Sequence, residues 1–298
     1  MTLVILAAGL SNRFGGLKQV EPIDDDNCFI IDYSIYDAIK AGFNKIVFVI
    51  NRENEDVFRK TVGNRISNVV KVEYAYQDNE QLKRIVDIPV SRVKPFGTAH
   101  ALYCAKNYID GPFGVISADD FYGPSSFVKL YDSLKSNECC TIGYEIASTI
   151  SKNGSVKRGV CFTKDGYLQE NMECELRKNN DEFIGKSLVD GTIRKFKKKD
   201  YVSMLMYGLD YSVMDYMNKD ILKFLDKNKN NLENCEYFLP TVLTNMIKEK
   251  VIKIKLVPTE EKWMGITYKE DLDDVKKYIE YLKKQNVYPR KLYDKVND

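Results

Sequence analysis

Short apolar runs alternate with helical patterns through the first half of the chain. Residues Thr2–Leu6 form a continuous apolar run, as expected for a strand that is covered on both faces. Apolar residues at helical spacing after Asp32 predict a helix that ends at Gly42. The alternation continues with predicted strands at 45–50, 70–76 and 113–117 and predicted helices at 54–62, 98–108 and 125–134. This order predicts a three-layer α/β fold with a mostly parallel central sheet.

The pattern changes between residues 140 and 210, where short alternating stretches flank turns such as Lys164-Asp165-Gly166. This is typical of antiparallel hairpins, so we expect a β-rich insert. Helical and strand patterns then return, with helices at 212–226, 237–248 and 269–284 and a strand at 251–257.

No internal repeat or linker interrupts the chain, which predicts a single domain over residues 1–298. Its core extends to about residue 270, and a C-terminal helix and tail follow over 270–298. The sequence leaves open whether this tail packs on the core or mediates a homo-oligomer.

The charge balance argues against a nucleic-acid-binding protein. The 45 Lys and Arg residues nearly cancel the 43 Asp and Glu residues and leave a formal charge of +2. Proteins that bind nucleic acids through their phosphates carry a strong basic patch instead. The one local basic cluster, Arg194–Lys199, is interpreted as a solvated edge. We therefore expect no nucleic-acid partner.

The seven cysteines are interpreted as free thiols. Their number is odd, C-x-x-C does not occur, and the spacings match neither a zinc site nor a disulfide framework. Such thiols suit a reducing compartment. The N-terminal apolar run lacks a positive leader, and no segment approaches the roughly 18 apolar residues of a membrane span. We expect a soluble, cytoplasmic protein without a membrane partner.

The first predicted strand runs directly into a loop with small residues, Ala7-Ala8-Gly9. Small residues at the end of a parallel strand let backbone amides approach a ligand. The loop lacks the G-x-G-x-x-G dinucleotide fingerprint and the Gly-Lys-Ser/Thr of a P-loop. It does carry two cations, Arg13 and Lys18, which suit the charge that builds on a departing pyrophosphate. A nucleoside triphosphate fits this combination.

The stretch Leu-Ala-Ala-Gly-x-x-x-Arg-Phe-Gly, followed by Lys-Gln, resembles the opening signature of the sugar-1-phosphate nucleotidyltransferases, the pyrophosphorylases that make nucleotide sugars. The resemblance implies a Rossmann-like nucleotidyltransferase fold. The loop departs from the commonest version at Leu10, where a glycine is frequent. The implied roles are nucleotide contacts for Leu6, Ala8 and Gly9, a grip on the phosphates for Arg13, and transition-state stabilisation for Lys18.

Two further stretches resemble nucleotide-binding elements of that family. Gln77 closes the third predicted strand, and its amide, which donates and accepts at once, suits the edge of a pyrimidine base. Gly97-Thr98 enters a predicted helix and is similar to the family's Gly-Thr pair, which implies an N-cap, free backbone amides and room for a ribose or base. His100, the single histidine, is interpreted as structural because the implied chemistry needs no imidazole.

The fourth predicted strand ends at an aspartate pair. Ser117-Ala118-Asp119-Asp120 resembles the family's apolar strand that ends in Gly-Asp, and Asp119 matches the metal-binding aspartate. A carboxylate there suits Mg²⁺, which takes its other oxygens from phosphates and water. Asp120 is adjacent, and strand alternation would point it elsewhere.

The acceptor side carries fewer signals. Gly159 and Glu173 resemble positions that contact sugar hydroxyls, although Cys174 replaces the lysine that usually follows the glutamate. Tyr207-Gly208 stands where the family often has a substrate turn.

The largest departure from the family pattern lies near the end. Lys262–Thr267 is similar to the family's Trp-x-Asp-x-Gly-Thr, but the aspartate that would be a second metal ligand is missing. Glu270 and Asp271 follow on a predicted helix and are not expected to reach the same point. The site therefore relies on Asp119 alone or recruits a carboxylate from elsewhere.

These features predict an enzyme that transfers a nucleotidyl group from a Mg²⁺-bound NTP to a phosphorylated small molecule, foremost a sugar 1-phosphate, and releases pyrophosphate. Three alternatives stay open: a cytidylyltransferase acting on phosphocholine or another alcohol phosphate, a nucleotide-sugar-dependent glycosyltransferase, and a non-catalytic nucleotide-binding module. The glycosyltransferase is disfavoured because Asp119 and Asp120 are adjacent and form no Asp-x-Asp motif.

Overall fold

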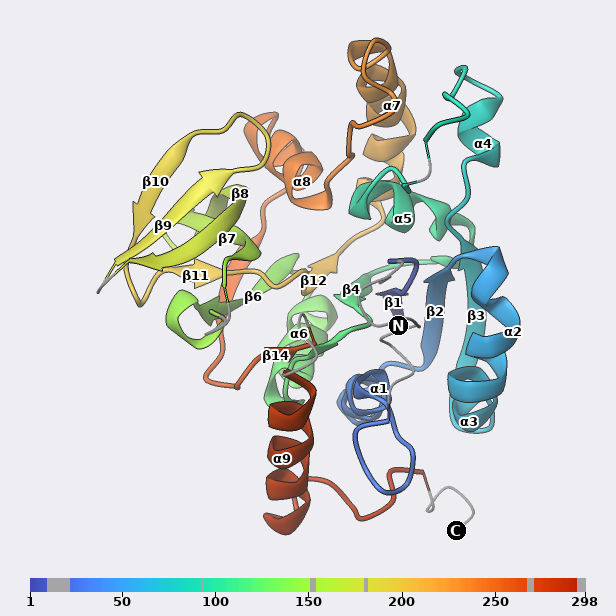
Figure 1. The fold of residues 1–298 in the computed structure, drawn as a ribbon, viewed down its shortest axis with the longest axis vertical. Coiled ribbons are helices and arrows are strands. Elements are labelled where there is room, and N and C mark those ends of the chain that lie inside the picture. Colours follow the sequence, from blue (N-terminus) through green and yellow to red (C-terminus); the bar gives the residue numbers. More distant parts are fainter. Residues whose placement is uncertain (10–21, 93, 151–153, 180–181, 267–270, 294–298) are drawn as a thin grey trace.

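The computed structural model describes residues 1–9, 22–92, 94–150, 154–179, 182–266 and 271–293. A mixed sheet of twelve strands runs through this part of the chain (Figure 1). Its strands are β1 (Thr2–Leu6), β2 (Lys45–Ile50), β3 (Lys71–Tyr76), β4 (Phe113–Ser117), β6 (Cys140–Glu145), β7 (Val156–Lys164), β8 (Tyr167–Asn179), β9 (Glu182–Ser187), β10 (Ile193–Phe196), β11 (Tyr201–Val202), β12 (Tyr207–Leu209) and β13 (Lys255–Pro258).

The longest parallel part of the sheet is N-terminal, and β13 adds one further parallel pair with β6. Strands β4, β1, β2 and β3 pair in parallel in that order, and every residue of β1 is buried. The continuous apolar runs predicted these strands because both faces of a parallel sheet are covered by helices. The expected α/β fold is thus confirmed.

The expectation of a mostly parallel sheet is not confirmed, because the path of strands beyond β4 is antiparallel. Beyond β4 the order is β12, β6, β11, β7, β8, β9 and β10, and each of these neighbouring pairs is antiparallel. The turn between β7 and β8 shows why these two strands pair antiparallel. Its residues Asp165 and Gly166 both have positive φ, 54° and 81°. Two such residues form a tight hairpin, whereas parallel strands need a long crossover.

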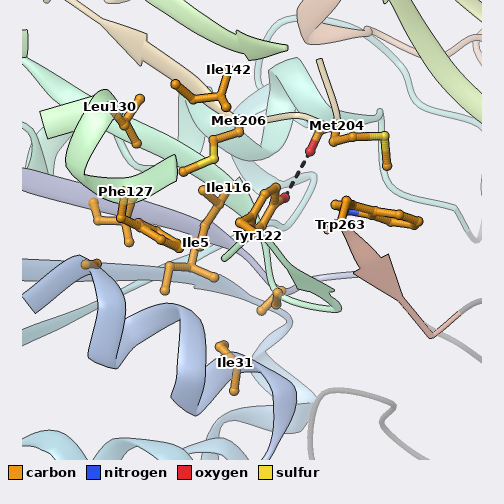
Figure 2. Packing of buried hydrophobic residues seen from close by; sticks show 14 of the residues in the cluster. Ile5, Ile31, Ile116, Tyr122, Phe127, Leu130, Ile142, Met204, Met206 and Trp263 are labelled. Atoms are coloured by element: carbon orange, nitrogen blue, oxygen red, sulfur yellow. Dashed lines mark hydrogen bonds between the residues drawn. The ribbon is translucent and has the colours of Figure 1, made fainter. Parts of the chain in front are cut away.

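Helices cover both faces of the sheet, as expected for three layers (Figure 1). One apolar core contains side chains of α1, α6 and the short helices α2 and α3, and the other contains side chains of α5, α7 and α8. Figure 2 shows part of the first core, where Ile5 and Ile116 of the sheet lie with Ile31 and Phe127. The helices are α1 (Ile30–Ala41), α2 (Glu55–Phe58), α3 (Asn64–Ile66), α4 (Glu80–Lys83), α5 (Thr98–Cys104), α6 (Pro124–Lys135), α7 (Ser212–Lys227), α8 (Leu239–Lys248) and α9 (Asp271–Lys284).

Most predicted helices match these bounds within a few residues, but the one predicted at 54–62 is not a single α-helix. It consists of α2, a π-helical turn at Arg59–Gly63, and α3. Gly63 lies against the Tyr74 hydroxyl, so that an added β-carbon would clash with it. Close packing on β3 thus accompanies the irregular turn, and apolar spacing alone does not predict it.

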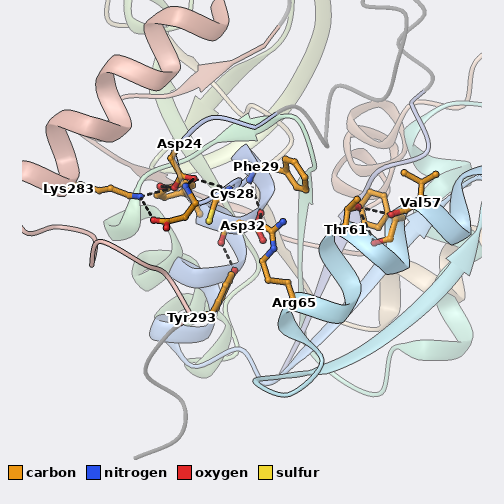
Figure 3. A network of polar contacts seen from close by, with 12 residues as sticks. Asp24, Cys28, Phe29, Asp32, Val57, Thr61, Arg65, Lys283 and Tyr293 are labelled. Carbon is orange, nitrogen blue, oxygen red and sulfur yellow. Dashed lines mark hydrogen bonds and ion pairs between the residues drawn. The ribbon is translucent and has the colours of Figure 1, made fainter.

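Asp32 explains where α1 begins. The helix starts at Ile30, and the Asp32 carboxylate, three residues after the cap position, accepts the N–H of Phe29 at 2.7 Å. The carboxylate is fully buried and also pairs with Arg65 at 2.7 Å (Figure 3). Burial raises the pKa of Asp32 to about 7, although the charge of Arg65 opposes the shift.

The C-terminal segment packs on the core, against α1 and the loop before it, which is one of the two roles left open for it. Lys283 of α9 pairs with Asp24 at 2.7 Å, and the Tyr293 hydroxyl donates to the Asp32 carbonyl at 2.8 Å (Figure 3). The Tyr288 hydroxyl donates to the buried carboxylate of Asp37 at 2.7 Å. Within the described ranges, no helix combines the length and apolarity needed to cross a bilayer.

Glycine at the end of α1 is required for two reasons. Gly42 has φ +118°, and an added β-carbon would lie 2.6 Å from the Tyr131 ring. Gly166 has φ +81° but no atom within 4 Å of such a carbon.

We predict that Gly166→Ala lowers the free energy of unfolding by about 1–2 kcal/mol through backbone strain alone. Gly42→Ala is expected to cost more, because the ring must also move, and urea unfolding of both variants would measure the difference. Equal losses in the two variants would show that the Tyr131 contact contributes nothing.

Candidate active site

Four of the residues predicted from the sequence follow parallel strands at one edge of the sheet. Ala8 follows β1, Gln77 follows β3 and Asp119 follows β4, while Leu6 is the last residue of β1. Because the carboxyl ends of parallel strands meet at the same edge, the structure brings these residues to one side of the molecule. Arg13 and Lys18 lie outside the described residues.

Two hydrogen bonds from the neighbouring strand region fix the backbone of the turn after β1. The N–H of Ala7 donates to the Val49 carbonyl at 2.8 Å, and the side-chain amide of Asn51 donates to the Ala8 carbonyl at 3.0 Å. Gly9 is exposed, and an added β-carbon there would meet no described atom within 4 Å. The backbone from Ala7 to Ala8 therefore has a defined path.

Gln77 is tied to the second predicted nucleotide element. Its side-chain Nε2 donates to the carbonyl of Gly97 at 2.9 Å. Gly97 has φ +96°, and an added β-carbon would lie 2.8 Å from the Tyr237 carbonyl oxygen, so only glycine fits. The amide oxygen and the second N–H of Gln77 are the groups it could offer to a base.

Thr98 differs from its expected role. Gly97 occupies the N-cap position of α5, and the Thr98 hydroxyl accepts the N–H of Leu239 at 3.0 Å. The sequence suggested free backbone amides at this helix start. The N–H of Ala99, however, donates to the Tyr237 carbonyl at 2.9 Å and is therefore not available to a ligand. The reason is that the loop before α8 packs directly on the start of α5.

His100 is a buried structural residue, as interpreted from the sequence. Its side chain is 1% exposed and lies edge-on to Phe96, with 5.9 Å between ring centroids. Burial lowers its pKa to about 4, so the imidazole is neutral at pH 7.

Ser117, the last residue of β4, bonds to Asp119 and is linked to Asp120 through Tyr122. Its hydroxyl donates to Asp119 Oδ1 at 2.5 Å. Its N–H donates to the Tyr122 hydroxyl at 2.9 Å, which lies 3.2 Å from Asp120 Oδ2. Burial raises the pKa of Asp120 well above its usual range, and the charge of Asp119 adds to the shift while Arg158 opposes it. Asp120 therefore binds a proton more readily than an exposed aspartate does.

On the antiparallel half, several oxygen atoms converge around Gly159. A β-carbon at this position would lie 2.5 Å from Asn171 Oδ1, 2.9 Å from Ser203 Oγ and 3.2 Å from Glu173 Oε1. The Asn171 amide donates to the Tyr207 hydroxyl at 2.7 Å, and that hydroxyl donates to Ser203 at 2.9 Å. We call Gly159, Asn171, Glu173, Ser203 and Tyr207 the acceptor group.

One atom of the acceptor group lacks a partner. Asn171 is 4% exposed, and its Oδ1 accepts no hydrogen bond from the described residues. Buried polar atoms are nearly always paired, so this oxygen points to a ligand that carries a donor.

Sequence reasoning missed Asn171 and Ser203. Asn171 precedes Glu173 by two positions on β8, so the period-two pattern of a strand could have placed it on the same face. Ser203 follows β11 directly and joins the group through its position near Gly159, for which the sequence carries no signal.

Gly208 does not join the acceptor group. An added β-carbon at Gly208 would lie 2.9 Å from Cys140 Sγ and 3.0 Å from Leu134 Cγ, so this residue faces α6. Side chains alternate along a strand, and Tyr207 therefore points to the opposite face.

Arg158 and Trp263 form a second unpredicted feature. The guanidinium lies 4.4 Å from the centre of the Trp263 ring, and its Nε and Nη2 both donate to the Thr149 carbonyl. Arg158 is 8% exposed, and burial lowers its pKa to about 10, while the charges of Asp120 and Glu173 oppose the shift. This buried cation therefore acts on both the aspartate pair and the acceptor group.

Helix α8 connects the nucleotide side with the acceptor group. Its first residue, Leu239, donates its N–H to Thr98, and the Thr244 hydroxyl accepts the N–H of Asn171 at 3.0 Å. Five residues of α-helix rise about 7–8 Å, so Gly97-Thr98 and Asn171 lie near one another although they are distant in sequence.

Comparison with known proteins now places the chain. A family model described as nucleotidyl transferase matches residues 3–281. The chain belongs to this nucleotidyl transferase family.

A UTP–glucose-1-phosphate uridylyltransferase of Bacillus subtilis (strain 168) is 30% identical over 129 residues, which are 39% of this chain and 43% of that protein. The match therefore spans less than half of that relative's length.

Two solved structures share the fold of this nucleotidyl transferase. The inositol-1-phosphate CTP transferase from T. maritima has a TM-score of 0.63 at 14% identity and covers 95% of this chain and 96% of its own. A UDP-glucose pyrophosphorylase complexed with UDP-glucose has a TM-score of 0.59 at 20% identity, with 95% and 98% covered. At these identities the likeness concerns the fold.

The described part of this nucleotidyl transferase holds no cluster of three His, Cys, Asp or Glu side chains arranged to bind a metal. A cation with few protein ligands fits better. Asp119 and Asp120 offer carboxylate oxygens at the end of β4, and Mg²⁺ prefers such ligands in small number.

The pKa of Glu173 generates a prediction about stability. Burial raises it to about 7, although the charges of Arg158 and Lys157 oppose the shift. A raised carboxyl pKa means that the folded state binds the proton of Glu173 more tightly than the unfolded state does. The protonated carboxyl therefore contributes its full share of the free energy of unfolding below the unfolded-state pKa, and this share is lost as pH rises through 7. Glu173→Gln should therefore stabilise the protein at pH 8, by roughly 1–3 kcal/mol, and have little effect at pH 4.

Denaturant unfolding at the two pH values measures this effect, with Glu233→Gln at an exposed position as the matched control. Equal effects of Glu173→Gln at both pH values would contradict the raised pKa.

Proposed function

We propose that this chain transfers a nucleotidyl group from an NTP to the phosphate of a polyhydroxylated small molecule, a sugar 1-phosphate, and releases pyrophosphate. The observation that carries this proposal is the acceptor group, whose buried oxygens lie across α8 from the Gly97-Thr98 turn in a member of the nucleotidyl transferase family. The relatives named for uridylyl and cytidylyl transfer to phosphorylated acceptors support it.

The proposed reaction is a single displacement at phosphorus. An oxygen of the acceptor's phosphate forms a bond to the α-phosphorus of the NTP, and the bond from that phosphorus to the bridging oxygen of the β-phosphate breaks. The bonding electrons leave with pyrophosphate. A phosphate monoester is already anionic near neutral pH, so no general base is needed. The protein contributes orientation and positive charge, and we assign the charge to Arg13 and Lys18.

We assign Mg²⁺ to the end of β4, with Asp119 as a ligand. When bound, the ion offsets the negative charge of the NTP phosphates. Ser117 holds the Asp119 carboxylate by a hydrogen bond and so orients it before the nucleotide arrives. Leu6, Ala8 and Gly9 contact the nucleotide in this proposal, and Gln77 favours a pyrimidine base.

The acceptor group favours a sugar phosphate over phosphocholine. Asn171 Oδ1 and Glu173 Oε1 are hydrogen-bond acceptors, and they require N–H or O–H donors on the ligand. Sugar hydroxyls supply such donors, whereas the quaternary ammonium of choline has none. Glu173 and Gly159 keep the roles assigned from the sequence, and Asn171 and Ser203 join them.

The described cysteines are all free, and we place the reaction in a reducing cytoplasm, where free thiols persist. Family membership argues against the glycosyltransferase alternative, because the matched family transfers nucleotides.

The direct test measures pyrophosphate release with Mg²⁺ from each common NTP against sugar 1-phosphates, inositol phosphate and phosphocholine. We expect release that needs one NTP and one polyhydroxylated acceptor. Release with phosphocholine alone would overturn the proposed acceptor class. If the protein binds nucleotide but releases no pyrophosphate with any acceptor of the panel, the non-catalytic alternative would be favoured.

Lys18→Ala should lower kcat by at least about a hundredfold, while the Kd for NTP changes by only a few fold, because the lysine acts on charge that develops in the transition state. Steady-state kinetics and nucleotide titration separate the two effects. Near-normal turnover in this variant would remove the lysine from the mechanism.

Asn171→Ala should raise the KM for the acceptor by about tenfold, because one hydrogen bond to a buried ligand is lost. The KM for NTP should stay unchanged. Asn218→Ala, on the exposed surface of α7, is the matched control. An unchanged acceptor KM in a folded Asn171 variant would show that Oδ1 does not contact the substrate.

A further inference from the structure

Gly265 stands opposite Asp120 in a short pair of strands that lies beside the main sheet. Strand β14 (Met264–Gly265) pairs antiparallel with β5 (Asp120–Phe121), and Gly265 is the direct partner of Asp120. In the motif that Lys262–Thr267 resembles, aspartate stands at the position of Gly265. The chain therefore lacks a carboxylate on β14 and carries one directly across the pair.

The Asp120 carboxylate fills the space that a side chain at position 265 would enter. An added β-carbon at Gly265 would lie 2.7 Å from Asp120 Oδ1 and 2.5 Å from the Trp263 ring. Residues directly opposite in an antiparallel pair project to the same face. The carboxylate of Asp120 thus projects to the same side as a residue-265 side chain would.

Ser117 contacts Asp119 directly and is linked to Asp120 through Tyr122. The Ser117 hydroxyl binds the Asp119 carboxylate, and the Ser117 N–H binds the Tyr122 hydroxyl, which lies next to the Asp120 carboxylate. Asp119 lies in the turn before β5, so strict strand alternation does not separate the two side chains. The expectation that Asp120 points elsewhere assumed one continuous strand.

The groups around Asp120 do not fully satisfy its carboxylate. The single proton of the Tyr122 hydroxyl is shared with the Met204 carbonyl, which is nearer at 3.0 Å (Figure 2). Trp263 is 8% exposed, and its indole N–H has no hydrogen-bond partner among the described groups although it lies near this carboxylate. Asp120 is partly buried beside Asp119, and the guanidinium of Arg158 supplies the positive charge from one side only. Two adjacent carboxylates whose oxygens are not all bonded offer the kind of ligands that a divalent cation takes.

We infer that Asp120 is a second ligand of the divalent cation, together with Asp119, and that β5 thereby supplies the carboxylate that β14 lacks. The inference rests on the proposed function, since it takes the metal-bound NTP as substrate. The negative charge that the motif's aspartate would supply at position 265 of β14 is supplied by Asp120 of β5 instead. The location of the charge is nearly the same, because directly paired residues lie side by side.

The first test measures Mn²⁺ binding by electron paramagnetic resonance in the presence of saturating NTP. Asp120→Asn should weaken Mn²⁺ binding by about tenfold or more, as loss of a ligand or its supporting contact does. Asp132→Asn, the same change at an exposed site on α6, should leave it unchanged. Wild-type affinity in the folded Asp120 variant would overturn the inference.

Asp120→Cys provides a direct test of ligation, because a thiolate prefers soft cations. We expect this variant to bind Cd²⁺ with a thiolate-to-cadmium absorption band that neither the wild type nor Asp132→Cys shows. No band in the folded variant with NTP bound would overturn the inference. NTP binding measured with Mg²⁺ present separates the outcomes. NTP binding with no effect of Asp120 on metal refutes only this ligand, whereas no binding of any NTP by the wild type refutes the proposed function as well.

Discussion

The hydroxyl of Tyr122 ties together the segments that make the site. The ring is fully buried, and its hydroxyl accepts the Ser117 N–H at 2.9 Å, donates to the Met204 carbonyl at 3.0 Å and lies 3.2 Å from the Asp120 carboxylate (Figure 2). Burying a hydroxyl this deeply costs free energy unless it is hydrogen-bonded, so the segments that carry its three partners are held in fixed positions relative to one another. The parallel half, β5 and the turn before β12 meet at this one atom.

The same contact holds a strained turn. Met204 and Leu205 both have positive φ, 43° and 59°, which non-glycine residues adopt at a cost. This turn leads from Ser203 to Tyr207, two members of the acceptor group. Helix α8 then sets how far that group lies from the Gly97-Thr98 turn through bonds to Thr98 and Asn171. The spacing between the Gly97-Thr98 turn and the acceptor group thus depends on a rigid helix and a buried hydroxyl. In the proposed function, this spacing would align the two reactants.

Much of the layout could be predicted from local patterns. Strands β1, β2 and β4 have the predicted bounds, because continuous apolar runs between polar turns leave few alternatives. The direction of the later strands could not be predicted as reliably, since a short alternating run pairs either way until its turns are known. The break of the 54–62 helix depends on the contact between Gly63 and Tyr74, two residues that meet only after β3 is in place.

The sequence by itself determined the small-residue turn after the first strand, the position of Asp119 at the end of the fourth strand, and the family, because these signals lie in contiguous residues. Only the tertiary structure decided that Asn171, Ser203 and Tyr207 form one polar group and that Asp120 lies against Gly265. These partners come from segments that are far apart in the chain, such as β5 and β14 for Asp120 and Gly265. Strand pairing brings them together, and no local pattern records which strands will pair.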